Sequence, residues 1–373
     1  MKCVIHAGKH KTGTTMVQSL LHDNQKILLD NKVLYPSTPD AIHHNFILDP
    51  FHKDYSPELL TSIADGAKRS GVELLLMSAE VVSTLPAEQL KQITDCLSGC
   101  ESISFLICLR HWDSFLPSRY AQSCKRRDSQ TYAEYLKSVS EVSLRHWDFY
   151  YDVLLENFFA SGHSVKIISY DHAVREKGLA AAILDAAGLS GLLDNKLLGN
   201  SGKINESNPW EINELLRLMN GVAANQVQVL QNPLFDQLAH GSRTDFSFFD
   251  FDRVLDQLEA RDVASCVEWI SENSTPLPKI PESHIQVEEK IMTTFGSHTV
   301  NSIGGCLFPA VPKGSSVSQV SSITWPEFIE WNPFLVRQLV TKALELTNLA
   351  LVSSRGNRAT RALARIRQRY LKH

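Results

Sequence analysis

Short apolar runs alternate with amphipathic stretches through the N-terminal half of the chain. The apolar runs are rich in leucine and β-branched residues, which is typical of strands buried in a parallel sheet. The predicted strands are Cys3–Ala7, Lys32–Pro36, Glu73–Met77, Ile103–Leu109 and Val165–Tyr170. The predicted helices are one that carries Met16, Val17, Leu20 and Leu21, and others over 57–70, 86–97, 132–161 and 179–187. This alternation predicts an α/β fold with a central, mostly parallel sheet and helices on both faces.

The pattern changes in the C-terminal half. Residues 209–260 have helical periodicity, whereas 271–325 are poor in periodicity and richer in proline, serine and glycine. We therefore predict an α/β domain with its helical part over 1–260, a linker or irregular excursion over 261–325, and a helical C-terminal extension with a basic tail over 326–373.

The tail from Arg355 to Lys372 has many basic side chains and no acidic one. One helical face of this segment is apolar, and it carries Ala359, Leu363, Ile366 and Tyr370. The segment is thus predicted to be an amphipathic basic helix, which either packs on the domain or makes a peripheral contact with an anionic membrane or a polyanionic substrate.

Composition narrows the class of protein. The chain has 373 residues, 43% of them hydrophobic, and a net charge of −4, which argues against nucleic acid as a partner. Met1 leads directly into a predicted strand and no apolar run is long enough to span a bilayer, so we expect a cytoplasmic protein. The seven cysteines fit reduced thiols better than a disulfide framework. Cys96 and Cys100 lack the second ligand pair that a zinc site needs.

The first predicted turn, Gly8–Thr15, has the composition of an anion-binding loop. It joins a strand to a helix, where backbone N–H groups and the positive end of the helix dipole meet. Thr12 and Thr14 are predicted to cap the helix, and Lys11 adds an ammonium group. The signature of nucleotide triphosphatases would place a lysine at position 14, where this chain has a threonine.

The string His10-Lys11-Thr12-Gly13-Thr14-Thr15, followed by an apolar helix, instead resembles the 5'-phosphosulfate loop of sulfotransferases that use 3'-phosphoadenosine-5'-phosphosulfate (PAPS). The resemblance covers roughly residues 1–220. It implies a P-loop-like nucleotide-binding fold with PAPS as sulfuryl donor, no metal, and an acceptor that is a carbohydrate or another small molecule. The oligomeric state stays open.

The same resemblance extends to two later segments. Arg110 follows a predicted strand and Ser118 comes eight residues later, as in the 3'-phosphate segment of these enzymes. An arginine offers a bidentate fork to phosphate and a serine offers a hydroxyl donor. Lys203 lies in a polar loop that resembles one which some members close over the 3'-phosphate.

The general base is not fixed by these motifs. His43 and His44 lie in the loop after the second predicted strand, and Glu80 follows the third. A histidine accepts a proton near neutrality without help, whereas a glutamate needs its pKa raised by burial. We therefore expect the base to be a histidine, His44 ahead of His43, with Glu80 as the alternative base or a group that orients the acceptor. Lys11 is expected to neutralise charge on the leaving oxygen.

Two other functions fit the same loop. One is a kinase that uses ATP, which would need Mg²⁺ ligands such as a strand-terminal aspartate, and Glu80 is the nearest substitute. The other is a nucleotide-binding regulator, which would keep the phosphate contacts without a base.

Overall fold

The computed structural model describes residues 1–36, 42–51, 55–125, 128–140, 150–193, 208–229, 251–277, 283–301, 306–309 and 319–354. These residues form two compact units, each of which is built from separate stretches of the chain. The first unit comprises Met1–Leu116, Val139–Glu206 and Lys279–Lys313. The second comprises Pro117–Ser138, Ser207–Pro278 and Gly314–His373. The division differs from the three consecutive parts predicted above, since the chain passes repeatedly from one unit to the other.

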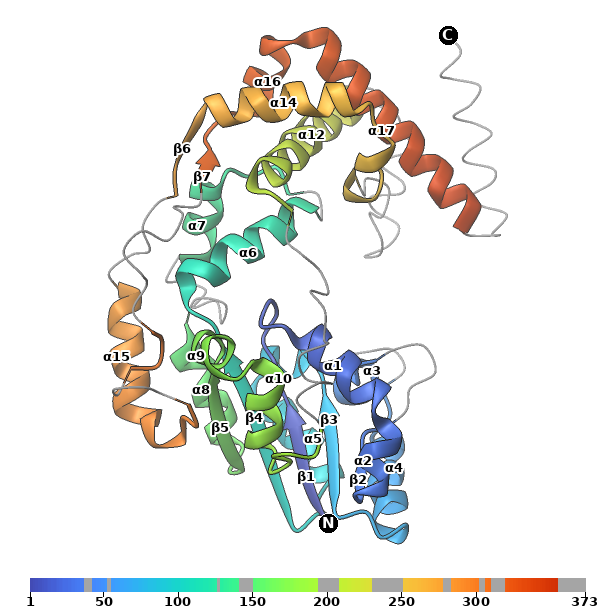
Figure 1. Cartoon of the computed structure of the whole chain (residues 1–373), viewed down its shortest axis with the longest axis vertical. Coiled ribbons are helices and arrows are strands. Elements are labelled where there is room, and N and C mark those ends of the chain that lie inside the picture. The colour runs from blue at the N-terminus through green and yellow to red at the C-terminus, as the bar shows by residue number, and fades with distance from the viewer. Residues whose placement is uncertain are drawn as a thin grey trace. The chain divides into compact units, whose positions relative to one another are not determined.

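A five-stranded parallel sheet forms the centre of the first unit (Figure 1). Its order is β2-β3-β1-β4-β5. The strands are β1 (Lys2–His6), β2 (Val33–Leu34), β3 (Leu74–Ser78), β4 (Ser102–Leu109) and β5 (Ser164–Ser169). All five strands predicted from the sequence are present. The α/β class and the central parallel sheet are therefore confirmed.

The register places β1 between β3 and β4. Cys3 lies opposite Leu75 of β3 and Ile103 of β4, and His6 lies opposite Ser78. Strands β2 and β3 lie on one side of β1, and β4 and β5 on the other. The chain therefore adds β2 and β3 on one side of β1 and then continues on the other side with β4, so that the strand order reverses between β1 and β4. In open α/β sheets, the loops that diverge at such a point leave a crevice at the carboxyl ends of the strands.

Helices flank the sheet on both faces because successive strand residues point to opposite sides. Val4, Leu76 and Leu106 point to the face that packs against α1 and α10. Phe105 points to the other face, where its ring lies 5.1 Å from Phe158 of α8. The helical elements of this unit are α1 (Thr14–Asp23), α2 (Gln25–Asp30), α3 (Asn45–Leu48), α4 (Pro57–Arg69), η1 (Val81–Thr84), α5 (Ala87–Cys96), α8 (Tyr151–Ala160), α9 (Tyr170–Glu176), α10 (Leu179–Ala186), α15 (Ser283–Phe295) and η4 (Gly296–His298).

The stretch predicted to be an irregular excursion, 261–325, contains regular structure. After α15 and η4, Thr299 forms a parallel bridge with Ile167 of β5, and the N–H of Val300 donates to the Ile167 carbonyl over 3.0 Å. This segment therefore satisfies part of the edge of β5, which would otherwise expose unpaired backbone groups. The sequence did not indicate it because the pairing partner lies more than a hundred positions earlier.

The second unit is mainly helical. Its own core includes Leu215 and Met219 of α12, Ile270 of α14 and Phe328 of α16. Its elements are α7 (Tyr132–Ser140), α12 (Trp210–Val229), η2 (Phe251–Arg253), η3 (Leu255–Gln257), α14 (Ala260–Glu272), α16 (Trp325–Trp331), α17 (Pro333–Ser354) and the antiparallel strands β6 (Ser274–Pro276) and β7 (Gln319–Ser321). Helix α6 (Trp112–Lys125) begins in the first unit and ends in the second.

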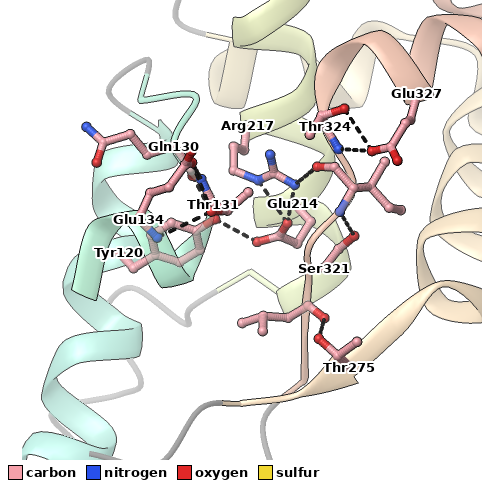
Figure 2. Close-up of polar contacts among 12 residues, drawn as sticks. Tyr120, Gln130, Thr131, Glu134, Glu214, Arg217, Thr275, Ser321, Thr324 and Glu327 are labelled. Atoms are coloured by element: carbon pink, nitrogen blue, oxygen red, sulfur yellow. Dashed lines mark hydrogen bonds and ion pairs between the residues drawn. The ribbon is translucent and has the colours of Figure 1, made fainter. Parts of the chain in front are cut away.

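A buried ion pair lies within this second unit (Figure 2). Arg217 donates from Nε and a terminal nitrogen to one Glu214 oxygen, over 2.9 and 2.7 Å, and also donates to the Ile323 carbonyl. The hydroxyl of Tyr120 donates to the other Glu214 oxygen over 2.9 Å. Burial acts to lower the pKa of Arg217, but the Glu214 carboxylate acts against it and the net pKa is raised. The pair is thus charged and joins α6, α12 and the segment before α16.

Candidate functional site

The loop between β1 and α1 has a backbone that few side chains allow. Lys11 has φ of 64° and Gly13 has φ of 72°, both in the left-handed region. A Cβ on Gly13 would lie 2.6 Å from Cδ2 of Leu179, and a Cβ on Gly8 would lie 2.1 Å from the Thr14 methyl group. The loop Gly8–Gly13 therefore needs glycine at both ends. Close packing excludes a side chain at Gly8 and at Gly13, and the left-handed φ also favours glycine at Gly13.

The two threonines predicted to cap α1 do not do so. Gly13 is the N-cap residue, and no side chain caps it among the described residues. The N–H and the hydroxyl of Thr12 both point back to the Lys9 carbonyl, over 3.2 and 2.5 Å. Thr12 therefore closes the loop, since both its N–H and its hydroxyl donate to a carbonyl of the loop itself. The first N–H groups of α1 are left without a side-chain cap, which suits a bound anion.

Arg110, at the end of β4, holds the loop from the neighbouring strand. It donates to the Lys11 carbonyl over 2.9 Å and from Nε to the Ser114 hydroxyl over 2.9 Å. Its guanidinium carbon lies 4.9 Å from the centre of the Tyr170 ring. The predicted role of Arg110 in binding the 3'-phosphate stays a prediction. Ser114 is the serine beside Arg110 in the structure.

Ser118, the serine predicted to act with Arg110, is half-buried in α6 and belongs to the second unit. Its role in 3'-phosphate binding stays a prediction. Lys203 lies outside the described residues, and so does the basic tail from residue 355 onwards.

Glu80 joins the loop to the end of β3. Its Oε1 accepts a hydrogen bond from the Thr14 hydroxyl, and its Oε2 lies 2.6 Å from Nδ1 of His10. The Glu80 side chain is 22% exposed. The structure therefore brings three of the predicted residues together at the first turn of α1. Thr15, the next residue of that turn, is exposed.

His44 lies in a different environment from Glu80. Nδ1 of His44 accepts from the Ser78 N–H over 2.9 Å, so that Nε2 carries the proton and donates to the Pro36 carbonyl over 2.9 Å. The side chain is fully buried, and burial lowers its pKa to about 4 although the hydrogen bond to the Pro36 carbonyl acts in the opposite direction. His44 thus holds the loop after β2 against β3. The neighbouring His43 is half-buried, and its Nδ1 accepts from the Asn45 N–H.

A polar cluster lies beneath the loop. Nδ1 of His6 lies 2.9 Å from the Ser78 hydroxyl, to which Gln18 of α1 also donates over 3.1 Å. Burial lowers the pKa of His6 to about 4, against the attraction of the Glu80 carboxylate. Within the described residues, Nε2 of His6 has no hydrogen-bond partner. This nitrogen is close to the backbone of Gly8, since a Cβ there would lie 2.8 Å from it.

Lys9 is the site residue that the sequence prediction missed. Although it sits in the loop, it is fully buried, and its Nζ lies 4.7 Å from the centre of the Phe115 ring and 4.8 Å from that of Tyr151. Such positions over aromatic faces stabilise an ammonium group. Trp112 stacks on Tyr151 at 4.6 Å. No local signal distinguishes Lys9 from Lys11, because the rings that surround it come from distant segments. Lys11 itself is half-buried.

The loop carries the cationic side chains of Lys9 and Lys11, and Arg110 donates to its Lys11 carbonyl. Two carboxylates lie nearby: Glu80 accepts from Thr14 at the first turn of α1, and Asp171 accepts from the N–H of His111, the residue after Arg110. Among the described residues, no group of three histidine, cysteine, aspartate or glutamate side chains is arranged to hold a metal ion.

Comparisons with known proteins do not identify a family. No family model matches the chain, and no curated protein or solved structure matches it. None of the described helices is long and apolar enough to cross a membrane.

Proposed function

We propose that the chain is a sulfotransferase that moves the sulfuryl group of PAPS to a hydroxyl or amine of an acceptor, with a carbohydrate or glycolipid as the favoured acceptor. The observation that carries the proposal is the loop Gly8–Gly13, closed on itself by Thr12, attached to Arg110 and followed by a helix without a side-chain cap. The uncapped N–H groups at the start of α1 lie at the end of this loop, which also carries Lys11. A phosphosulfate is a ligand of matching charge.

The strand order supports a P-loop-like fold. The proposed phosphate loop follows the central strand β1. The segment that begins with Arg110 follows β4, which is the strand next to β1 at the point where the strand order reverses. A nucleotide that lies over these two carboxyl ends would have its 5' end at α1 and its 3' end near the start of α6. Lys11 and residues Thr12 to Thr15 are then assigned to the 5' end, and Arg110 to the 3'-phosphate.

The chemistry is an in-line displacement at sulfur. The acceptor oxygen forms a bond to sulfur while the bond from sulfur to the 5'-phosphate oxygen breaks, and 3',5'-ADP leaves with the negative charge. Lys11 and the N-terminus of α1 stabilise that charge. The acceptor proton goes to a base. The geometry favours Glu80 over His44, since Glu80 is partly exposed and adjoins Thr14, whereas His44 is buried with both ring nitrogens bonded to backbone groups. His43 stays an alternative base.

Titration of the full chain with PAPS, 3',5'-ADP and ATP–Mg²⁺ tests the binding part of this proposal. We expect the two ligands with a 3'-phosphate to bind in the presence of a chelator, and ATP to bind much more weakly. Lys11→Ala should weaken PAPS binding about tenfold or more while the melting temperature stays unchanged, because a half-buried loop lysine contributes charge and little packing. Tighter binding of ATP–Mg²⁺ than of PAPS would favour the kinase instead.

The proposal includes a cytoplasmic location, and it leaves open whether the basic tail packs on the domain or contacts an anionic membrane or a polyanionic substrate. If the tail contacts a membrane, removal of residues 355–373 should abolish sedimentation of the chain with vesicles that contain an anionic phospholipid. Unchanged sedimentation would show that this tail makes no such contact.

A further inference from the structure

Both oxygens of the Glu80 carboxylate are contacted by side chains of the loop and of the helix after it. Oε1 accepts from the hydroxyl of Thr14 in the first turn of α1, and Oε2 lies 2.6 Å from Nδ1 of His10. An ionised carboxylate only accepts hydrogen bonds, so the ring nitrogen that faces it carries a proton. His10 therefore donates to Glu80 from Nδ1.

The backbone of Glu80 is fixed independently of these contacts. The Ala79 N–H donates to the His6 carbonyl over 3.1 Å and continues the pairing of β3 with β1. The N–H and the hydroxyl of Ser83 donate to the Glu80 carbonyl over 3.0 and 2.8 Å. These bonds place the Cα atom of Glu80, but they do not set the torsions of its long side chain. The contacts to the carboxylate therefore select its position.

The turn that carries His10 is held on both sides of β1. His10 and Lys11 are the central residues of this turn, which the Thr12 N–H closes. The His10 ring reaches Glu80 after β3, whereas the Lys11 carbonyl accepts from Arg110 after β4. The ring that contacts Glu80 thus belongs to the residue next to the lysine that is expected to neutralise charge on the leaving oxygen.

The pair of His10 and Glu80 is partly exposed, at 30% and 22% of the two side chains. A pair in contact with water adds little to the stability of a fold. A carboxylate that takes a proton in a transition state must lie within hydrogen-bond reach of the group that releases it, and a small displacement lowers the rate steeply. The contact therefore matters more for the orientation of Glu80 than for folding.

We propose that His10 is a positioning residue for Glu80, whose Oε2 it holds so that the carboxylate is in place to receive the acceptor proton. This inference rests on the proposed function, with Glu80 as the base. The acceptor hydroxyl gives its proton to a Glu80 oxygen as its own oxygen bonds to sulfur and the bond from sulfur to the 5'-phosphate oxygen breaks. His10 keeps its proton throughout. Each carboxylate oxygen has a second lone pair, so the contacts from His10 and Thr14 leave room for the transferred proton.

Transfer rates at saturating PAPS and PAPS titrations of His10 variants separate this role from donor binding. His10→Ala should lower kcat about 10- to 100-fold, with PAPS affinity within about twofold and an unchanged melting temperature. His10→Asn should recover most of the rate, because its amide N–H takes the place of the Nδ1–H. His22→Ala, at a half-buried position in the last turn of α1, is the matched control and should change neither value. A loss of PAPS affinity as large as the loss of kcat in His10→Ala would overturn the proposal.

A double variant decides whether His10 acts through Glu80. His10→Ala should lower the rate no further in a chain that already carries Glu80→Gln, because the group that it positions no longer accepts a proton. Losses that multiply in the double variant would overturn the proposal, since His10 would then act on the reaction by itself.

The contact itself is read on the wild-type chain without any transfer assay. NMR of the ring nitrogens, with His10→Asn to assign the signal, should show the neutral His10 ring with its proton on Nδ1, and a proton on Nε2 would overturn the proposal. The two failures are distinguishable. A wild type that transfers no sulfate from PAPS would contradict the proposed function and this role together, whereas a normal rate in His10→Ala would overturn this role alone.

Discussion

At the scale of single residues, Glu80 connects the proposed chemistry to the loop. It accepts a hydrogen bond from the Thr14 hydroxyl and pairs with His10. Glu80→Gln keeps an oxygen for the Thr14 hydroxyl but cannot accept a proton. We expect kcat to fall about 10²- to 10⁴-fold with PAPS affinity unchanged, as measured by transfer rate at saturating PAPS and by titration. His43→Ala is the matched control. A near-normal rate for Glu80→Gln with a large loss for His43→Ala would return the base to the histidine pair.

Arg110 has two separable roles in this account. It binds the Lys11 carbonyl in the structure, and it is proposed to contact the 3'-phosphate. Arg110→Ala should therefore weaken PAPS about tenfold more than adenosine 5'-phosphosulfate, which lacks that phosphate. Arg69→Ala, at an exposed position of α4, should change neither affinity. Equal losses for both ligands would show that Arg110 acts only by holding the loop.

Buried His44 makes the free energy of unfolding depend on pH. Its folded pKa is about 4, below the value of about 6.5 in an unfolded chain, so the unfolded chain binds more protons between these pH values. Stability is therefore full above about pH 6.5 and decreases as the pH falls toward about 4. His44 should account for about 2 kcal/mol between about pH 7 and pH 5.

Urea unfolding of the wild type and of His44→Gln at those two pH values measures this contribution. The pH dependence should be smaller in the variant by that amount, and the remainder includes a term from His6, whose pKa burial also lowers. An identical pH dependence in the two proteins would contradict the buried, neutral state of His44.

Some residues of this candidate site could be proposed from the sequence, and others could not. Lys11, Gly13 and Arg110 could be proposed as site residues because each belongs to a short local string that follows a predicted strand. The burial of Lys9 and the bond from Thr14 to Glu80 join segments that are far apart in the chain. Such contacts depend on the sheet register, and no local pattern encodes them. The preference for a histidine base rested on the intrinsic pKa of the imidazole group, which burial lowers in His44.

At the scale of elements, the β1–α1 loop depends on Gly13. Gly13→Ala would require a left-handed residue with a side chain, and its Cβ would lie 2.6 Å from Leu179. We expect a loss of about 1–3 kcal/mol in stability and a weaker PAPS complex, since the loop must shift. Gly71→Ala is the control. Gly71 has φ of 75°, but an added Cβ would have no atom within 4 Å.

Thermal melting and PAPS titration of both variants separate strain from function. Gly71→Ala should lower the melting temperature slightly without changing PAPS affinity. Similar PAPS affinities for the two variants would show that the shape of the loop at Gly13 is not needed for binding.

Apolar periodicity was sufficient to predict the five strands of the central sheet, but it did not predict the elements between residues 261 and 325. The strands of the first unit read as continuous apolar runs because helices cover both faces. The elements between 261 and 325 are short, exposed or paired with distant segments, as the bridge between Ile167 and Thr299 illustrates. Their periodicity is weak for that reason. The division into two units also had no signal, because it depends on which segments pack together.

At the scale of the whole molecule, the second unit depends on a charged pair in its interior. Arg217 and Glu214 are 1% and 2% exposed, so removal of one partner leaves the other charged and buried. Arg217→Met should destabilise the unit by about 3–5 kcal/mol. The double variant Glu214→Leu with Arg217→Met should recover most of that loss, because both desolvated charges are then gone.

Chemical denaturation of the wild type, the single variant and the double variant measures both values. A double variant as unstable as the single one would contradict this reading and would assign the stability to the further hydrogen bonds from Tyr120 and to Ile323.

Sulfuryl transfer from PAPS at the loop Gly8–Gly13 is the function that we propose for the whole molecule. The most direct measurement incubates the full chain with PAPS labelled on sulfur, or with ATP labelled on its terminal phosphate, and a panel of carbohydrate and glycolipid acceptors, with Mg²⁺ and then with a chelator. The account predicts labelled sulfate on an acceptor in both conditions, and its loss in Lys11→Ala. Label transferred from ATP only when Mg²⁺ is present, or no transfer from PAPS to any acceptor, would contradict it.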